Sequence, residues 1–219
     1  MVTDVASVYV VRNEVDPDYE YHCDALAERV PAAREVEFVD GERVPVEDAD
    51  GVVLTGSTAG VYEADRRPWI AEQEALVCDL VAAEVPTLGV CFGHQVANSA
   101  LGGTVEHVGT TAALVSATLV EDPLFDGVEP VVPSLHGDLV TEPGRGMERI
   151  ASADHAPVFG TRHETAPLWT VQFHPEVTAA LRERLVEDFD FETGTHSFED
   201  VAAERVFENF WRLLGAGDE

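Results

Sequence analysis

One stretch of the chain limits the fold more than any other: residues 85–103, VPTLGVCFGHQVANSALGG. It reads as a short apolar strand, a sharp turn that carries Cys91, and then a helix. Gly89, Cys91 and Gly93 have the spacing G-x-C-x-G of a nucleophile elbow, with sulfur in place of a serine oxygen. An abrupt strand-to-helix turn brings backbone segments close together, so glycine is expected two residues before and two after the nucleophile.

The same turn predicts the chemistry of Cys91. It places the thiol at a helix N-terminus, where the macrodipole and free N–H groups favour a thiolate. The N–H of Phe92, the residue after the nucleophile, is then positioned to donate to an oxyanion. The alternative is an inert core cysteine, because cysteine is among the most buried residue types.

A second stretch, LWTVQFHPEV at residues 168–177, favours the reactive cysteine. It is an apolar strand that ends in His174, Pro175 and Glu176. A thiolate nucleophile needs a base, and the base needs a group that orients it. His174 and Glu176 are two residues apart, so in an extended chain both side chains point the same way. We therefore expect Glu176 to hold one imidazole nitrogen while the other faces Cys91.

Together these stretches resemble the class I, triad-type glutamine amidotransferases, specifically the amidotransferase domain of GMP synthase and its stand-alone relatives. The matching motifs occur in the family's order across about residues 8–177. They are GVCFGHQ at 89–95, QFHPE at 172–176, LTGSTAGVYE at 54–63 with PWI at 68–70, and LHGDLVTEPGRGMERIAS at 135–152. The resemblance implies hydrolysis of the side-chain amide of L-glutamine by Cys91, His174 and Glu176, without a metal or organic cofactor for this half-reaction.

The resemblance also implies an oxyanion hole. Gly56 would supply the second donor beside Phe92, and the segment that begins at Gly56 would touch the glutamine backbone. This chain has Gly-Ser-Thr at residues 56–58, where relatives carry two glycines and a proline. We transfer the family's role in the oxyanion hole to Gly56, and we include Ser57 among the expected substrate contacts. Without the Cys91 motif, the segment would read as an ordinary strand-to-helix turn.

Three further residues are expected to contact substrate by resemblance. Gln95 lies one helical turn after Cys91, on the same side of the helix. His136 and Gly137 belong to a loop that in the family closes over the α-amino end of glutamine, largely with backbone groups. Leu135 stands where relatives have a polar residue. The alternatives are a surface helix position for Gln95 and a bystander in a turn for His136.

The pattern of apolar runs predicts the fold. Buried parallel strands are expected at residues 5–11, 35–39 and 51–55, and helices at 16–30 and 69–81. This alternation of strands and helices predicts a parallel sheet with helices on both faces. We expect a single glutamine amidotransferase domain over residues 1–219: a three-layer α/β/α sandwich with a parallel-dominated, flavodoxin-like sheet. Ligands in such sheets bind at the carboxyl ends of the strands.

The second half of the chain is expected to complete the sheet. Residues 103–120 should form strands at its edge, and a strand over 131–138 should run into the loop at 136–138. Further strands are expected at 147–152, 158–162 and 168–173. An amphipathic helix is expected over 198–214, followed by a frayed tail at 215–219.

Charge is the unusual part of the composition. There are 42 acidic and 13 basic residues, a net charge of −29, and every basic residue is arginine. This excess argues against nucleic acid as a partner bound through its phosphates. The hydrophobic content of 45% is too high for a disordered chain. Because the acids are scattered, we interpret them as the solvated coat of a protein adapted to high salt, resembling haloarchaeal proteins. A surface built for a basic partner is the alternative.

The remaining features point to a cytoplasmic protein. Three cysteines give no disulfide framework, and no secretory leader or membrane-spanning run is present in the sequence. Cys23 and Cys78 lie in helical patterns without a zinc-binding motif, so we interpret them as structural. His94 lies close to the nucleophile, but His174 has the better context, so His94 is also interpreted as structural.

The fate of the ammonia stays open. The sequence has no phosphate-binding loop of the G-x-x-x-x-G-K-S/T kind and no lysine to build one. Ammonia would therefore be released or pass to a separate ATP-dependent synthetase, by resemblance one that makes GMP from XMP. Two alternatives remain: a γ-glutamyl hydrolase acting on a larger substrate, and a non-catalytic binding relative. The intact triad argues against the second.

Overall fold

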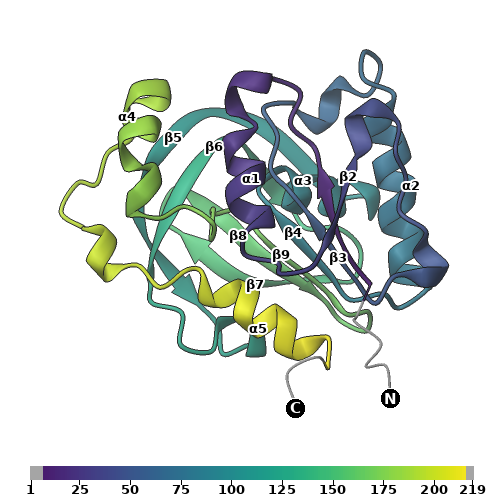
Figure 1. The fold of residues 1–219 in the computed structure, drawn as a ribbon. Coiled ribbons are helices and arrows are strands. Elements are labelled where there is room, and N and C mark those ends of the chain that lie inside the picture. The colour runs from purple at the N-terminus through teal and green to yellow at the C-terminus, as the bar shows by residue number, and fades with distance from the viewer. Residues whose placement is uncertain (1–6, 216–219) are drawn as a thin grey trace.

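The apolar runs form one mixed sheet in the computed structural model, which describes residues 7–215 (Figure 1). Within those residues the sheet has nine strands, in the order β2-β1-β3-β4-β9-β8-β7-β5-β6. Their bounds are β1 Val8–Arg12, β2 Arg34–Glu37, β3 Gly51–Leu54, β4 Thr87–Val90, β5 Thr104–Leu119, β6 Val131–Glu142, β7 Met147–Ala153, β8 Ala156–His163 and β9 Leu168–Val171. Residues 5–6 of the first expected strand and residues 216–219 of the expected tail lie outside the described part of the chain.

The strands β2, β1, β3, β4 and β9 are parallel, and the other four continue the sheet in antiparallel pairs. The parallel half has the flavodoxin order 2-1-3-4-5, with β9 as its fifth strand. The strand order reverses at β1, so the crevice for a ligand is expected beyond the carboxyl ends of β1 and β3. The predicted fold class is confirmed.

Helices cover both faces of the sheet. The helices α1 (Tyr21–Ala27) and α5 (Arg205–Leu213) pack on one face, in front of the strands in Figure 1. The helices α2 (Trp69–Ala82) and α3 (Phe92–Ala100) pack on the other. Alternate residues of β1 divide between the two faces, as the period of a strand requires. Each fully buried large apolar side chain contributes about 1.5–3 kcal/mol to this three-layer packing.

One helix was not predicted from the sequence. The helix α4 (Arg182–Phe189) lies beside β5 and β6 (Figure 1). Leu185 is its one fully buried residue. Leu185 joins a small third core with Leu114 of β5 and Val131 of β6. A helix with a single buried residue and many charges has too weak an apolar stripe to be recognised from periodicity.

Two predicted helices are shorter than expected. The pattern over 16–30 divides into a 3-10 turn at Pro17–Tyr19, capped by Asp16, and the helix α1. The pattern over 198–214 begins with a 3-10 turn at Phe198–Asp200. Val201 then pairs with Val131 at the end of the sheet, so its backbone is extended and the helix starts only at Arg205.

The prediction for residues 103–120 and 136–138 was wrong in detail. The first segment is one long strand, β5, which lies second from the edge, and β6 is the edge strand. Residues 136–138 lie inside β6, because the β5–β6 ladder continues on both sides of them. The irregularity falls on β5 instead, where three residues between His107 and Thr111 face Gly137 alone. Gly109 in this bulge has a φ of +95°, which glycine adopts without strain.

Across residues 7–215, none of the helices combines the length and the apolar character needed to cross a membrane.

Candidate active site

The carboxyl ends of four parallel strands meet at one cavity. Glu14 follows β1, Ser57 follows β3, Cys91 follows β4 and His174 follows β9, and all four residues line a cavity of about 280 Å³. This is the position that the strand order predicts for a ligand.

The backbone of Cys91 is strained. Its φ of +53° and ψ of −105° lie outside the regions that residues with a side chain normally adopt. Such a conformation costs about 1–3 kcal/mol and persists where the surroundings hold it. The Cys91 N–H donates to Val171 of β9 at 2.9 Å, and its carbonyl accepts from the N–H of Gln95 at 3.0 Å. The junction of β4 and α3 is therefore the sharp strand-to-helix turn that was expected at Cys91.

The two glycines of the elbow are required by close backbone contacts. A Cβ on Gly89 would lie 2.5 Å from the carbonyl oxygen of Gly93. A Cβ on Gly93 would lie 2.5 Å from the carbonyl oxygen of Leu54. The expected clash within the elbow is thus confirmed for Gly89, whereas Gly93 is restricted by the neighbouring strand β3.

His174 and Glu176 form the predicted contact. The Nδ1 atom of His174 lies 2.6 Å from Oε1 of Glu176, and the side chains are 4% and 0% exposed. The expected extended chain is wrong, however. The N–H of Val177 donates to the carbonyl of His174 at 3.1 Å, which closes a turn past the end of β9. The turn brings the carboxylate back to the imidazole.

Both ring nitrogens of His174 face acceptors. Its Nε2 lies 2.9 Å from the carbonyl oxygen of Leu135, and the Cys91 sulfur lies 3.7 Å from the same oxygen. Burial disfavours the imidazolium, but the charges of Glu176 and Cys91 outweigh burial and raise the pKa of His174. An imidazolium that donates from both nitrogens fits this geometry.

Two backbone N–H groups are left available beside Cys91. In the described part of the chain, those of Gly56 and Phe92 have no acceptor. A Cβ on Gly56 would lie 3.4 Å from Cε1 of His174 and 3.5 Å from Cβ of Cys91, so the Gly56 backbone lies beside both.

The other predicted contact residues also line the cavity: Ser57, Gln95, His136 and Gly137. The amide of Gln95 donates to the carbonyl of Asp138 at 3.2 Å, which ties α3 to β6. The ring of His136 stacks on His155, with centroids 5.3 Å apart. Burial and this second ring lower the pKa of His136 to about 3, so its imidazole is neutral.

Three residues interpreted as structural are not among the residues that line the cavity. His94 is buried against Thr170 at 2.7 Å, and burial lowers its pKa to about 3. Cys23 is buried and donates to the hydroxyl of Thr55 at 3.4 Å, whereas Cys78 is exposed on α2. Within residues 7–215, no group of three or more His, Cys, Asp or Glu side chains is arranged to hold a metal ion.

The sequence analysis missed a buried clamp beside the elbow. The Glu14 carboxylate accepts from the N–H and hydroxyl of Thr58, and its Oε2 lies 2.9 Å from Nε2 of His22. Proline, which the resemblance leads one to expect at position 58, could donate neither bond. The threonine at position 58 is therefore accompanied in this chain by the Glu14 carboxylate, which accepts both of its hydrogen bonds. Its position directly after β1, at the strand-order reversal, is the signal that could have identified it.

His22 connects this clamp to the elbow. Its ring packs edge-on against His174 with centroids 6.1 Å apart, and its Cε1 would lie 3.3 Å from a Cβ on Gly56. Burial disfavours the imidazolium, but hydrogen bonds with Cys23 and Glu14 outweigh burial and raise the pKa of His22 to about 10.

With this geometry in view, comparisons with known proteins identify the family. The family model "Glutamine amidotransferase class-I" matches residues 18–192. The chain belongs to this family.

Curated relatives of this amidotransferase include two GMP synthases (glutamine-hydrolyzing). The protein of Parafrankia sp. (strain EAN1pec) is 44% identical over 107 residues, 47% of this chain and 20% of the relative. The protein of Pyrobaculum aerophilum is 37% identical over 134 residues, 60% of this chain and 25% of the relative. The matched part thus spans a quarter or less of these relatives' length.

Solved structures share the fold of this amidotransferase. A glutamine amidotransferase of Thermotoga maritima has a TM-score of 0.71 at 22% identity, covering 96% of this chain and 94% of that one. A glutamine amido transferase of Methylobacillus flagellatus has a TM-score of 0.72 at 17% identity, covering 94% of each chain. At these identities the likeness shows the fold alone.

The close approach at Gly93 predicts a stability effect. Gly93→Ala should lower the free energy of unfolding by about 1–3 kcal/mol, because a methyl group would press on the β3 backbone. Gly56→Ala should cost less, because its nearest contacts are side-chain atoms at 3.3–3.5 Å. Urea unfolding measures both. Equal midpoints for the two variants would contradict the packing described at the elbow.

The Glu14–His22 pair predicts a pH-dependent stability. The pKa of His22 rises from about 6.5 in an unfolded chain to about 10 in the fold. Its contribution is therefore fully present below pH 6.5 and is lost as the pH rises to 10. The difference in unfolding free energy between the wild type and His22→Gln should shrink over that interval. A constant difference for His22→Gln over that interval would contradict the ion pair.

Proposed function

We propose that this chain hydrolyses the side-chain amide of L-glutamine, with Cys91 as nucleophile, His174 as acid and base, and Glu176 as the group that orients His174. The observation that carries the proposal is the convergence of these three side chains at a strained elbow beside two available N–H groups. Membership of the class I family supports the same reaction.

The first half-reaction follows from the positions of these groups. The Cys91 thiolate, paired with the His174 imidazolium, attacks the carboxamide carbon, and the developing oxyanion accepts from the N–H groups of Phe92 and Gly56. Each such donor stabilises a transition state by about 3 kcal/mol. The Nε2 proton of His174, which now faces the Leu135 carbonyl, passes to the leaving nitrogen. The C–N bond breaks, and ammonia departs from a γ-glutamyl thioester.

The second half-reaction reverses the role of His174. Its Nε2, now neutral, takes a proton from a water molecule that attacks the thioester carbon. The C–S bond breaks, the sulfur leaves as the thiolate beside the His174 imidazolium, and glutamate leaves, which restores the starting state. Glu176 keeps Nε2 directed at the reacting atoms and stabilises the imidazolium in both steps.

The proposed substrate contacts divide by type. Ser57 and Gly56 meet the glutamine backbone beside the elbow, and Gln95, His136 and Gly137 line the cavity on the β6 side. His136 is neutral, so we assign its contact to hydrogen bonding rather than to charge.

We propose that the ammonia passes to a separate ATP-dependent synthetase. The relatives named GMP synthase (glutamine-hydrolyzing) support a synthetase that converts XMP to GMP as the first candidate. The chain matches only a quarter or less of those proteins, which leaves ample length in them for a second activity.

Ammonia release tests the proposed function. The purified chain, in concentrated KCl to screen its net charge of −29, should release ammonia from L-glutamine, and Cys91→Ala should release none. Cys78→Ala, which removes an exposed thiol on α2, is the matched control and should keep full activity. If no ammonia forms, labelling with the glutamine analogue 6-diazo-5-oxo-L-norleucine follows. Absence of a Cys91 adduct as well would refute the catalytic proposal.

The role of Glu176 gives a second prediction. Glu176→Gln keeps the shape of the side chain but removes the charge that stabilises the His174 imidazolium. The value of kcat should fall on the order of 10³–10⁴-fold, with a much smaller change in KM. Steady-state kinetics check this, with Glu183→Gln on the exposed face of α4 as control. A loss confined to KM would place Glu176 in substrate binding instead.

A further inference from the structure

The cavity is larger than glutamine alone requires. Its volume of about 280 Å³ approaches the value of about 300 Å³ at which pockets for drug-sized ligands begin, and glutamine is smaller than such ligands. Its lining also contains two groups of residues that differ in chemistry.

One end of the cavity is polar. The Asp138 carboxylate accepts from the hydroxyl of Tyr62 at 3.3 Å and lies 2.8 Å from Nδ1 of His107. Gln95 donates to the carbonyl of the same aspartate. Charged and hydrogen-bonding groups of this kind suit the α-amino and α-carboxylate groups of a glutamyl substrate.

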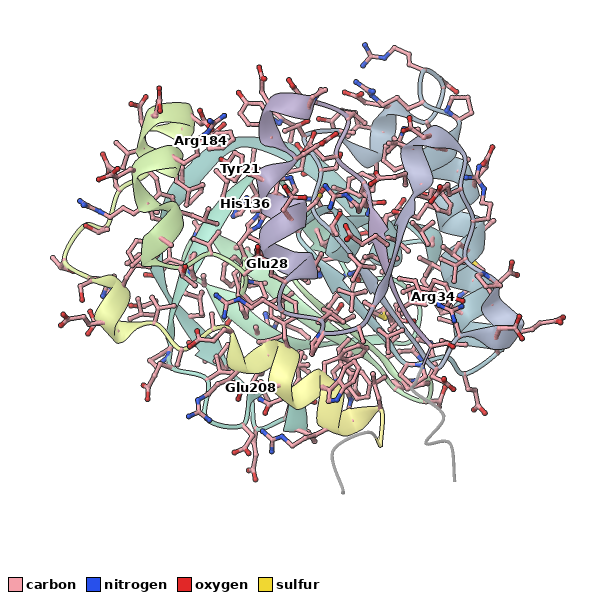
Figure 2. The ribbon with its side chains drawn as sticks, in the orientation of Figure 1. Tyr21, Glu28, Arg34, His136, Arg184 and Glu208 are labelled. Carbon is pink, nitrogen blue, oxygen red and sulfur yellow. The ribbon has the colours of Figure 1, made fainter. Side chains whose placement is uncertain are left out.

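The other end is aromatic. Three aromatic residues line the cavity and are only partly buried: Tyr19 at the end of the 3-10 turn, Tyr21 at the start of α1 and Phe189 at the end of α4. The rings of Tyr19 and Phe189 have centroids 5.0 Å apart. Figure 2 shows Tyr21 facing Arg184 of α4, whose guanidinium lies 5.1 Å from the ring centroid.

The charges around this aromatic end are paired. Arg184 binds Asp188 at 2.7 Å, and His22 binds Glu14 at 2.9 Å. An occupant of this end therefore meets aromatic rings and neutralised ion pairs, which favours an uncharged, aromatic group.

A chain of ring contacts connects this end to the proposed acid. Tyr21 packs edge-on against His22 at 6.4 Å, and His22 packs edge-on against His174 at 6.1 Å. His174 delivers the proton to the leaving nitrogen, so a substituent on that nitrogen starts beside His174. The ring contacts connect that point to Tyr21 through His22.

We propose that the aromatic end binds the leaving amine, and that the chain hydrolyses γ-glutamyl amides of aromatic primary amines in addition to glutamine. This inference rests on the proposed function. The Cys91 sulfur displaces the amine, the C–N bond breaks, and the amine leaves as a neutral molecule with the Nε2 proton of His174. Water then cleaves the thioester and releases glutamate.

A matched pair of substrates tests the subsite. γ-Glutamyl benzylamide and γ-glutamyl methylamide share the glutamyl group and an alkyl-substituted amide nitrogen, and differ mainly in the ring. The wild-type chain should have a kcat/KM at least roughly tenfold higher for the benzylamide, because the ring leaves water for an aromatic wall. L-Glutamine is assayed beside them.

Variants then locate the preference. Phe189→Ala should bring the benzylamide-to-methylamide ratio of kcat/KM close to one, and Phe189→Leu should leave an intermediate ratio. Val186→Ala, on the exposed side of the same helix, should keep the wild-type ratio. Thermal melts confirm that each variant is folded, and the wild-type comparison stands even if an alanine variant is not.

The outcomes separate the two proposals. Hydrolysis of glutamine with equal or no turnover of the two substituted amides would overturn the subsite and leave the proposed function intact. A ring preference that survives in Phe189→Ala would also overturn the subsite. No hydrolysis of any amide, together with no Cys91 adduct from the diazo analogue, would overturn both proposals.

Discussion

The strained backbone of Cys91, with its positive φ, is the constraint on which the site depends. The strand β4 lies between β3 and β9, and all three end at the same edge of the sheet. The elbow after β4 therefore places the sulfur between the Gly56 segment after β3 and His174 after β9. The strained conformation of Cys91 persists because the helix α3 packs closely against β3. The packing is so close that a side chain at Gly93 would clash with the β3 backbone.

Buried charge is the second constraint. His174 with Glu176 and His22 with Glu14 are both largely removed from water, and each histidine has its pKa raised in spite of burial. Removing one partner of such a pair leaves the other charge uncompensated in a medium of low dielectric constant. The two imidazolium rings pack edge-on with centroids 6.1 Å apart, so the carboxylates that neutralise them also limit their mutual repulsion.

The sequence predicted the parts of the molecule that local pattern determines. The elbow, the parallel strands and the pairing of His174 with Glu176 follow from short motifs and apolar runs, and all three are present. The way in which Glu176 reaches His174 was not predictable, because a turn and an extended chain both bring side chains two residues apart together. Only the hydrogen bond of Val177 distinguishes them.

Features that depend on distant segments were missed. The helix α4 has one buried leucine, so its apolar stripe is too short to recognise. Glu14 and His22 carry no motif, and their role emerges only when β1 and β3 lie side by side and Thr58 meets the carboxylate. The position of Phe189 in the cavity wall likewise depends on how α4 packs against β5 and β6.

The most direct test is to trap the covalent intermediate. The chain is mixed with L-glutamine, quenched in acid within the first turnover, digested and examined by mass spectrometry. The proposed mechanism predicts a γ-glutamyl group on the peptide that contains Cys91, and none in the Cys91→Ala variant. Ammonia release without acylation of Cys91, or acylation of Cys23 or Cys78 instead, would contradict the nucleophile assigned here.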